Sequence, residues 1–383
     1  MAAVVAALLA AGLVGAATVE PEDGSPSPAT TTTTAPAPGG SSTTTTPAAG
    51  SVADVVPSIE AFVADERGLA FKNPVNVTLL DDERFEARVN ESDEEDKEEI
   101  EHAQSVLQAM GLLGHDVDLG AIVRSFTAGA VVGFYDPDTK ELVVRGTRPT
   151  PFVRAVLAHE LLHALEDQHF GLNRDDLGDE AFLGFQALTE GSAVRIEDRY
   201  RQSLSRADRR AADREERAQG GSVPDVPEVV EVLFGFPYAY GPGLVDAIVR
   251  AGGQARLDGA YGDPPASSEQ VISPDRYLGG DAPKAVPTPA ADGKAFDDGE
   301  IGQLFLALML RSELKDSVAR TAAVGWGGDH YVAWRDGART CVRMDFVMDT
   351  PTDTAELTDA LADWAAERKG AATATGTSLR TCG

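Results

Sequence analysis

The stretch VLAHELLHALEDQHF, at residues 156–170, constrains the fold more than any other part of this chain. It contains His159, Glu160 and His163 in an H-E-x-x-H arrangement. Each residue of an α-helix advances by about 100°, so the two histidines lie on one face, one turn apart, where both can bind one metal ion. Glu160 lies beside that face, within reach of a water molecule bound to the ion. The spacing predicts metal-assisted hydrolysis.

The neighbours of these three residues are uncharged, which predicts a buried helix. Two histidines inside a protein need partners for their ring nitrogens. Core hydrogen bonds would satisfy a lone histidine. For a pair of histidines with Glu160 between them, a metal ion is the favoured partner. The uncharged positions are Val156, Leu157, Ala158, Leu161, Leu162, Ala164 and Leu165.

A catalytic zinc ion has three protein ligands and one open position for water. We expect the third ligand to be Glu190, from a second helix predicted over residues 179–200. A lone carboxylate on an apolar helix face needs a cation to be buried there, and Gly191 leaves room for a neighbouring backbone. The alternative is an ion pair with Arg195 at the rim of the helix. The apolar positions on the same face are Leu183, Ala187 and Val194.

Two acidic residues, Glu166 and Asp167, follow His163 on roughly the same side of the helix. They either orient a ligand histidine as hydrogen-bond acceptors or belong to a polar, solvated helix end. The pattern does not separate the two interpretations.

Hydrolysis also requires a donor that stabilises the developing oxyanion. Among the candidates we select Tyr240, because Gly241 and Pro242 follow it in an otherwise helical region. Ordinary packing is the alternative for each tyrosine. The other candidates are Tyr238, Tyr261, Tyr277 and His330.

The beginning of the chain has the layout of an exported protein. Residues 1–18 are almost wholly Ala, Val, Leu and Gly and predict a signal peptide or an N-terminal anchor. Residues 19–52 are rich in Thr and Pro, have no apolar periodicity and predict a disordered linker. We therefore expect an extracellular or cell-surface location, with membrane contact only through an uncleaved N-terminal segment. In an exported protein Cys341 and Cys382 would form a disulfide, whereas two unrelated thiols are the alternative.

The folded part is predicted to span residues 53–383 as one domain, with an α/β subregion at 320–383. The fold class is α+β and predominantly α-helical. A β-hairpin formed by residues 130–135 and 141–146 precedes the histidine helix. The hairpin is either purely structural or an edge to which an extended peptide adds as a strand. The net charge of −29 argues against nucleic acid or anionic membrane surfaces as partners.

The motif with its downstream Glu190-Gly-Ser-Ala resembles gluzincin-type, thermolysin-like zinc metallopeptidases. The resemblance implies an HExxH metallopeptidase-like core, one Zn²⁺ ion bound by His159, His163 and Glu190, and Glu160 as the general base. Several stretches are also similar to a bacterial family of metallopeptidase-like proteins of uncharacterised function: HALEDQHF (163–170), PYAYGP (237–242), DPPASSEQVISPDRYL (263–278) and GWGGD (325–329). The chain departs from that family at Ser273, where a histidine is expected, and His330 is also unusual.

We therefore expect a zinc-dependent hydrolase that cleaves peptide bonds in peptides or proteins. Glu160 takes a proton from the attacking water and passes it to the leaving amine. One alternative is a non-catalytic extracellular binding protein on a metallopeptidase scaffold. Another is an amidase acting on cell-wall material.

Overall fold

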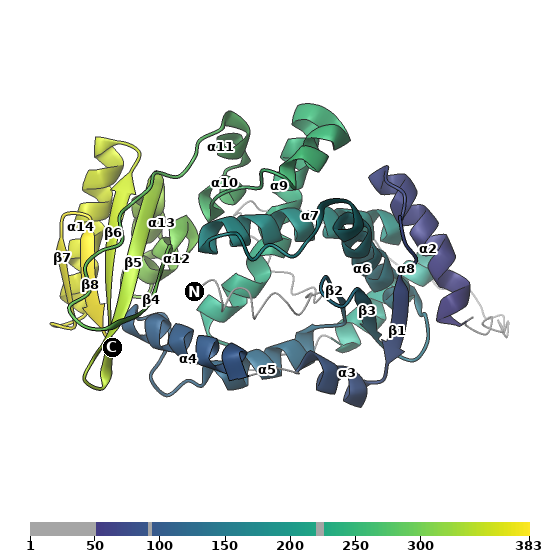
Figure 1. Ribbon diagram of the computed structural model, residues 1–383, viewed down its shortest axis with the longest axis horizontal. Helices are drawn as coiled ribbons and strands as arrows, with labels where there is room; N and C mark the ends of the chain where they lie inside the picture. The colour runs from purple at the N-terminus through teal and green to yellow at the C-terminus, as the bar shows by residue number, and fades with distance from the viewer. Residues whose placement is uncertain (1–50, 91–93, 220–225) are drawn as a thin grey trace, which may run out of the picture.

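The computed structural model describes residues 51–90, 94–219 and 226–383. The predicted signal segment and all but the last two residues of the predicted linker lie outside these ranges. The described chain is α+β and mostly helical, as the sequence predicts. Figure 1 shows a small sheet with its helices at one end, a larger sheet at the other end, and long helices between them.

The small sheet contains the predicted hairpin. β3 lies in the centre of the sheet and pairs in parallel with β1 and antiparallel with β2. Within this sheet β2 pairs with β3 alone, so β2 is an edge strand. The carboxylate of Asp136 accepts hydrogen bonds from the backbone N–H groups of Asp138 and Thr139 and thereby closes the turn. The strands are β1 (Asn76–Leu80), β2 (Gly133–Asp136) and β3 (Glu141–Arg145).

The motif residues lie on two helices, one that packs against this sheet and a second that packs against the first. α6 (Pro151–Phe170) begins with Pro151 in its first turn, and the Thr150 hydroxyl accepts a hydrogen bond from the Val153 N–H. It packs against α7 (Asp179–Ser203), α2 (Val52–Arg67) and α8 (Arg206–Gln219). All residues of α6 from Ala155 to Asp167 are buried, which confirms the predicted burial of this helix.

A close crossing joins α7 to α9 (Glu228–Ala260). A β-carbon added to Gly191 would lie 2.2 Å from the backbone carbon of Gly241, and one added to Gly241 would lie 2.2 Å from the Ala187 carbonyl oxygen. Only glycine at both positions permits this approach. The prediction that Gly191 admits a neighbouring backbone is therefore confirmed.

Within the described residues, α9 is the helix that is long and apolar enough to cross a membrane by length and composition. Its buried residues contribute to the large hydrophobic core. Its last turns follow a break at Gly252 and Gly253, where the backbone leaves helical conformation.

The larger sheet has the order β4-β5-β6-β8-β7, and all of its pairs are antiparallel. Cys341 and Cys382 are direct cross-strand partners on β6 and β8 and form a disulfide, as predicted for an exported chain. The elements are β4 (Ala295–Gly299), α12 (Gly302–Arg311), α13 (Asp316–Ala323), β5 (Trp326–Asp336), β6 (Arg339–Met348), α14 (Pro351–Glu367), β7 (Ala372–Thr375) and β8 (Ser378–Cys382).

Connecting helices tie the two ends together. In Figure 1, α4 and α5 run along one side from the large sheet toward the small one. The end of α4 is fixed to the large sheet because the Ala109 carbonyl accepts hydrogen bonds from Thr381 and Arg368. The remaining helices are α3 (Asp82–Val89), α4 (Glu94–Ala109), α5 (Leu119–Ala130), α10 (Ser268–Ile272) and α11 (Pro274–Gly279).

Candidate metal centre

The structure brings the predicted ligands of α6 and α7 together. The Nε2 atom of His159 lies 3.1 Å from Oε2 of Glu190, and Nε2 of His163 lies 3.5 Å from the same oxygen. In a tetrahedral site, ligand atoms about 2.0–2.2 Å from a zinc ion are about 3.3–3.6 Å apart. The observed separations agree with this spacing to within a few tenths of an ångström. One nitrogen from each histidine and one carboxylate oxygen thus surround a common point.

A fourth residue, Glu197, fixes the orientation of His159. Its Oε2 atom lies 3.2 Å from Nδ1 of His159, on the opposite side of the ring from Glu190. A neutral imidazole has one N–H and cannot donate to two carboxylates. If Nδ1 donates to Glu197, Nε2 presents its lone pair toward Glu190, which is the arrangement of a metal-binding histidine with a carboxylate behind it.

Glu197 is itself held in place by charge. The Arg201 guanidinium donates to Oε1 of Glu197 at 2.9 Å and forms a second pair with Glu216 at 3.0 Å. Sequence reasoning missed Glu197 because the charged stretch after it was interpreted as a surface helix. The signal was present, since Glu197 follows Glu190 by two helical turns and shares its face.

The charges of this cluster are strongly coupled. Burial alone would lower the pKa of His159, but hydrogen bonds to Glu190 and Glu197 outweigh burial and raise the pKa. Burial alone would raise the pKa of Glu190, but His163 and His159 outweigh it and lower the pKa. Glu190 is therefore an anion that needs positive charge beside it, which either imidazolium or a metal cation supplies.

Glu160 differs from the other carboxylates of the cluster. Its side chain is fully buried, and neither carboxylate oxygen has a hydrogen-bond partner. Burial raises the pKa of Glu160 to about 7. A β-carbon added to Gly133 would lie 3.2 Å from Oε1 of Glu160, so the edge strand β2 passes directly over this carboxylate. A free carboxyl group with a near-neutral pKa is suited to proton transfer.

The structure corrects the prediction for the tyrosines. Tyr240 is 44% exposed and packs on Phe236, away from the histidines. Tyr238 lies near them instead, with its ring centroid 6.4 Å from that of His159. Its hydroxyl oxygen is buried without a hydrogen-bond partner, and burial together with Glu190 and Glu160 raises its pKa well above 10. Two residues of an α-helix advance by about 200°, so Tyr238 and Tyr240 lie on nearly opposite faces of α9 and cannot face the same site.

The other candidates from the sequence have structural partners elsewhere. Glu166 accepts hydrogen bonds from Arg67 and Ser192 and so joins α6 to α2 and α7. Asp167 accepts from the Tyr135 hydroxyl and from Lys140. Among the described residues, neither carboxylate forms a hydrogen bond or ion pair with the two histidines. The remaining oxyanion candidates contact other groups: Tyr261 stacks on Phe170, Tyr277 donates to the Asp263 carbonyl, and His330 lies 3.1 Å from Asp298.

A pocket of about 320 Å³ opens beside the cluster, with His163 and Glu190 in its wall. This volume is at the lower end of the range of ligand pockets, about 300–1,000 Å³. The turn of the hairpin, the loop after α6 and the first half of α7 form the other walls. The candidate metal centre is therefore accessible to a ligand.

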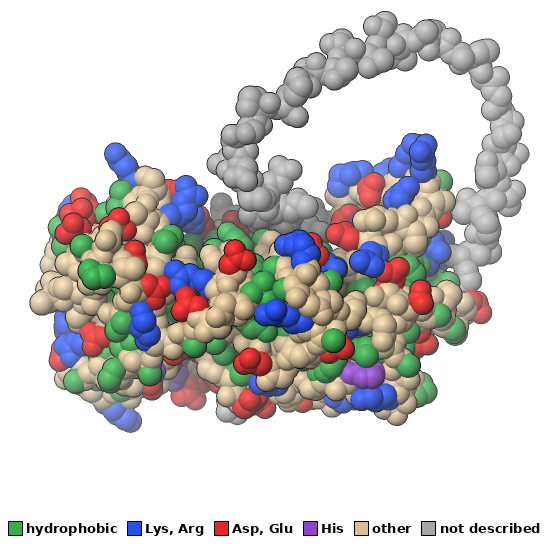
Figure 2. All heavy atoms as spheres, turned by 90° about the horizontal axis from the view of Figure 1, so that it is seen from above, with side chains coloured by type: hydrophobic (Ala, Val, Ile, Leu, Met, Phe, Trp, Pro, Cys, Tyr) green, Lys and Arg blue, Asp and Glu red, His purple; other side chains and the backbone are tan. Residues whose placement is uncertain are grey.

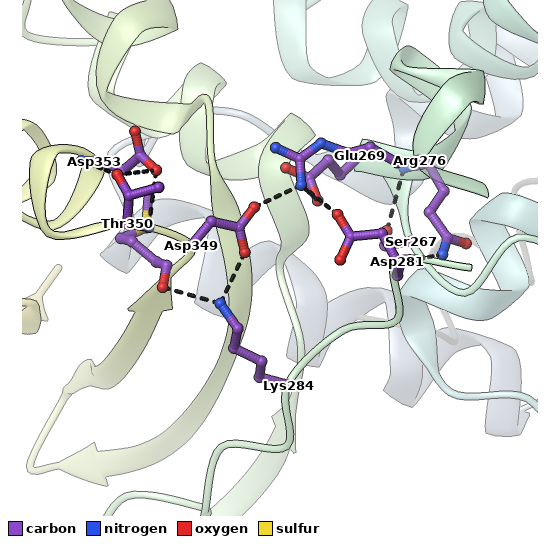
Figure 3. Close-up of polar contacts among 10 residues, drawn as sticks. Ser267, Glu269, Arg276, Asp281, Lys284, Asp349, Thr350 and Asp353 are labelled. Carbon is purple, nitrogen blue, oxygen red and sulfur yellow. Dashed lines mark hydrogen bonds and ion pairs between the residues drawn. The ribbon is translucent and has the colours of Figure 1, made fainter. Parts of the chain in front are cut away.

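A second group of carboxylates, Glu269, Asp281 and Asp349, also lies within the range of shared metal ligands. Figure 3 shows the Arg276 side chain among them. Its Nη1 atom is 3.4, 2.6 and 2.5 Å from Glu269, Asp281 and Asp349, respectively. Lys284 adds a second cation, 2.8 Å from Asp349. Two of the protein's own cations thus offset most of the charge of these three carboxylates, and the group joins α11 to the end of β6.

Two of the stretches that resemble the metallopeptidase-like family, residues 263–278 and 325–329, hold the starts of α7 and α12 in place. Asp329 accepts hydrogen bonds from the N–H groups of Ile301 and Gly302 at the start of α12 and from the Trp326 indole. The Ser268 hydroxyl and N–H both donate to Glu180 at the start of α7. Ser273 ends α10 and makes no contact with the histidines that the structure describes.

The surface in the view of Figure 2 carries acidic and basic side chains intermixed over most of the described face.

Comparison with known proteins relates the C-terminal part of the chain to a protein family. Residues 291–381, which include the larger sheet and α12 to α14, match a family described as a domain of unknown function (DUF8575). No curated protein and no solved structure matches the chain. The matched region begins before the α/β subregion expected at 320–383 and does not include α6 or α7.

Proposed function

We propose that the protein is a zinc-dependent metallopeptidase. The observation that carries this proposal is the convergence of His159, His163 and Glu190 from two buried helices, beside an unpartnered Glu160. Two nitrogens and one oxygen at these separations fit a zinc ion with an open position, whereas calcium and magnesium prefer oxygen ligands alone. The nearest metallopeptidase type by motif is the gluzincin group.

A zinc ion at this position supplies Lewis acidity toward water and toward the substrate carbonyl. The protein's own side chains transfer the proton and stabilise the oxyanion. Glu160 accepts the proton of the attacking water and delivers it to the leaving amine, for which its pKa of about 7 is suitable. Tyr238 replaces Tyr240 as the proposed oxyanion donor, because its unpaired hydroxyl is available to donate a hydrogen bond to the developing oxyanion.

The position of β2 supports a peptide substrate. This strand is an edge of the small sheet and passes over Glu160 at Gly133. An extended peptide that adds to this edge would have its backbone beside the general base. We further propose that the protein is exported, which the Cys341–Cys382 disulfide supports because disulfides persist in oxidising compartments.

The test is the Glu160→Gln variant, assayed with quenched fluorescent peptides and, in parallel, with cell-wall fragments containing amide bonds. We expect kcat on peptides to fall by about 10²- to 10⁴-fold, with zinc content equal to that of the wild type. Full activity in the zinc-loaded variant would refute the role of Glu160.

The parallel arms separate the rival functions. Zinc binding without turnover on either substrate class would favour a binding protein on a metallopeptidase scaffold. Turnover of the cell-wall fragments alone would favour an amidase. Either result would overturn the peptidase assignment.

A further inference from the structure

The pocket beside the candidate metal centre changes character from its inner wall to its rim. Its buried members include His163, Glu190 and Phe185. Phe182 and Leu172 are partly buried and add apolar surface. At the rim lie the exposed side chains of Asp138 and Asp175. A side chain that enters from solvent therefore meets carboxylates first and apolar surface next.

The cations around the pocket do not offset this negative charge. Arg174 lines the pocket, but its guanidinium is paired with Asp176 at 2.9 Å. Lys140 lies 2.7 Å from the buried Asp167.

Asp136 is partly shielded, because it accepts backbone hydrogen bonds and lies 3.5 Å from Arg88. Asp138 accepts a neutral hydrogen bond from Asn173 at 2.7 Å. In the part of the chain that the structure describes, no ion pair involves Asp138 or Asp175. The rim therefore carries two carboxylates without a cation of the protein to balance them.

We propose that this pocket selects peptides with a lysine or arginine side chain, an inference that rests on the proposed peptidase function. The long aliphatic stem of such a side chain packs on Phe182 and Leu172, while its cationic group pairs with Asp138 and Asp175. Because His163 and Glu190 share the pocket wall, the bound side chain holds the neighbouring peptide bond close to the candidate metal centre. Acidic peptides are repelled by the same rim.

Binding is measured separately from turnover, with the full-length zinc-loaded Glu160→Gln protein and labelled hexapeptides Gly-Ala-X-Ala-Ala-Gly, where X is Lys, Arg, Ala or Glu. We expect the Lys and Arg peptides to bind roughly tenfold more tightly than the Ala peptide, as two partly exposed ion pairs allow. Adding Asp138→Asn and Asp175→Asn should reduce the preference below about threefold. Raising the salt to about 0.5 M should also reduce it.

The matched control is Asp359→Asn with Asp363→Asn, which removes the same charge from the exposed face of α14. It should retain the full preference for cationic peptides. Equal binding of all four peptides, binding of none, or the same loss of preference in the control would overturn the inference.

The wild-type protein assayed with the same peptides distinguishes the two proposals. Selective binding without any cleavage would leave the pocket inference standing and refute the peptidase. Cleavage at equal rates for X as Lys, Ala and Glu would refute the pocket inference and leave the peptidase standing.

Discussion

The described residues contain two groups of three potential metal ligands, and these groups differ in what balances their charge. In the first, Glu190 lies against two histidines, and Glu160 beside them has no partner. In the second, the three carboxylates surround Arg276, with Lys284 beside them (Figure 3). Proximity of acidic groups is common to both. What separates them is that the second contains its own cations, whereas the first uses ligands suited to zinc.

The difference explains why one group is a candidate for catalysis and the other for structure. A carboxylate paired with a guanidinium is already stabilised and has little to gain from a metal ion. Glu160, in contrast, is buried at a cost in free energy that no hydrogen bond offsets. Such a cost is tolerated where a buried group performs chemistry.

The largest expected difference between the two groups is in zinc binding, and it is tested by removing one carboxylate from each group. Glu190→Gln should abolish stoichiometric zinc binding, because it replaces an anionic ligand with a neutral amide. Asp349→Asn, in the second group, should leave zinc binding at the wild-type level. Isothermal titration with Zn²⁺ measures both. Equal loss in the two variants would show that the groups do not differ as described.

The next largest effect concerns the carboxylate behind His159. Glu197→Gln should weaken zinc binding by about 10- to 100-fold, because the ring of His159 loses its charged acceptor. Glu216→Gln is the matched control, since Glu216 pairs with Arg201 but does not contact the histidine. The two affinities are compared by competition with a chelator. If Glu216→Gln bound zinc as weakly as Glu197→Gln, both substitutions would lower the zinc affinity by disturbing the fold.

In the second group, the expected effect is on stability. Arg276→Met leaves three carboxylates without their shared cation and should lower the free energy of unfolding by about 1–3 kcal/mol, with zinc affinity retained. Arg320→Met removes an exposed pair with Asp316 and should cost less than about 0.5 kcal/mol. Urea unfolding measures both. A loss of zinc in Arg276→Met would contradict the separation of the two groups.

Glu180 illustrates a third way to bury a carboxyl group, by protonation. Burial raises its pKa to about 8, from an ordinary value near 4.5. The folded state then binds more protons than the unfolded chain between these values, so this contribution to stability is complete below pH 4.5 and is lost as the pH rises through 8.

Glu180→Gln should therefore flatten the decline of stability with pH by about 1 kcal/mol between pH 6 and 7. Glu356→Gln, at an exposed position of α14, should leave the slope as in the wild type. Urea midpoints at the two pH values measure the slope. An identical slope in Glu180→Gln and the wild type would show that Glu180 is ionised at pH 6.

The sequence was sufficient for the local features of the site. The i, i+4 spacing placed His159 and His163 on one face, and the apolar face of the next helix identified Glu190. The hairpin and the disulfide were also predictable, from turn residues and from cysteine position. These features depend on short-range periodicity or on a small number of alternatives.

The features that were missed depend on how helices are rotated against each other. Tyr240 was chosen because it precedes Gly241, yet Gly241 itself faces Gly191 across the helix crossing. Tyr238 precedes Gly241 by three residues and therefore lies on the same face of α9. Tyr240 points away from the histidines and packs on Phe236. Recognising the two glycines as a contact pair would have selected Tyr238, the tyrosine that lies near His159. The pairing of Arg276 with Asp349, 73 residues further along the chain, had no such signal in the sequence.

The most direct test of the central claim is X-ray absorption spectroscopy of the wild-type protein loaded with one equivalent of Zn²⁺. The account predicts two imidazole nitrogens at about 2.0–2.1 Å and carboxylate oxygen at about 2.0–2.2 Å in four-coordinate geometry. Glu190→Gln should lose this signature. Zinc surrounded by oxygen ligands alone, or a protein that retains no zinc, would contradict the assignment of His159, His163 and Glu190 as a metal centre.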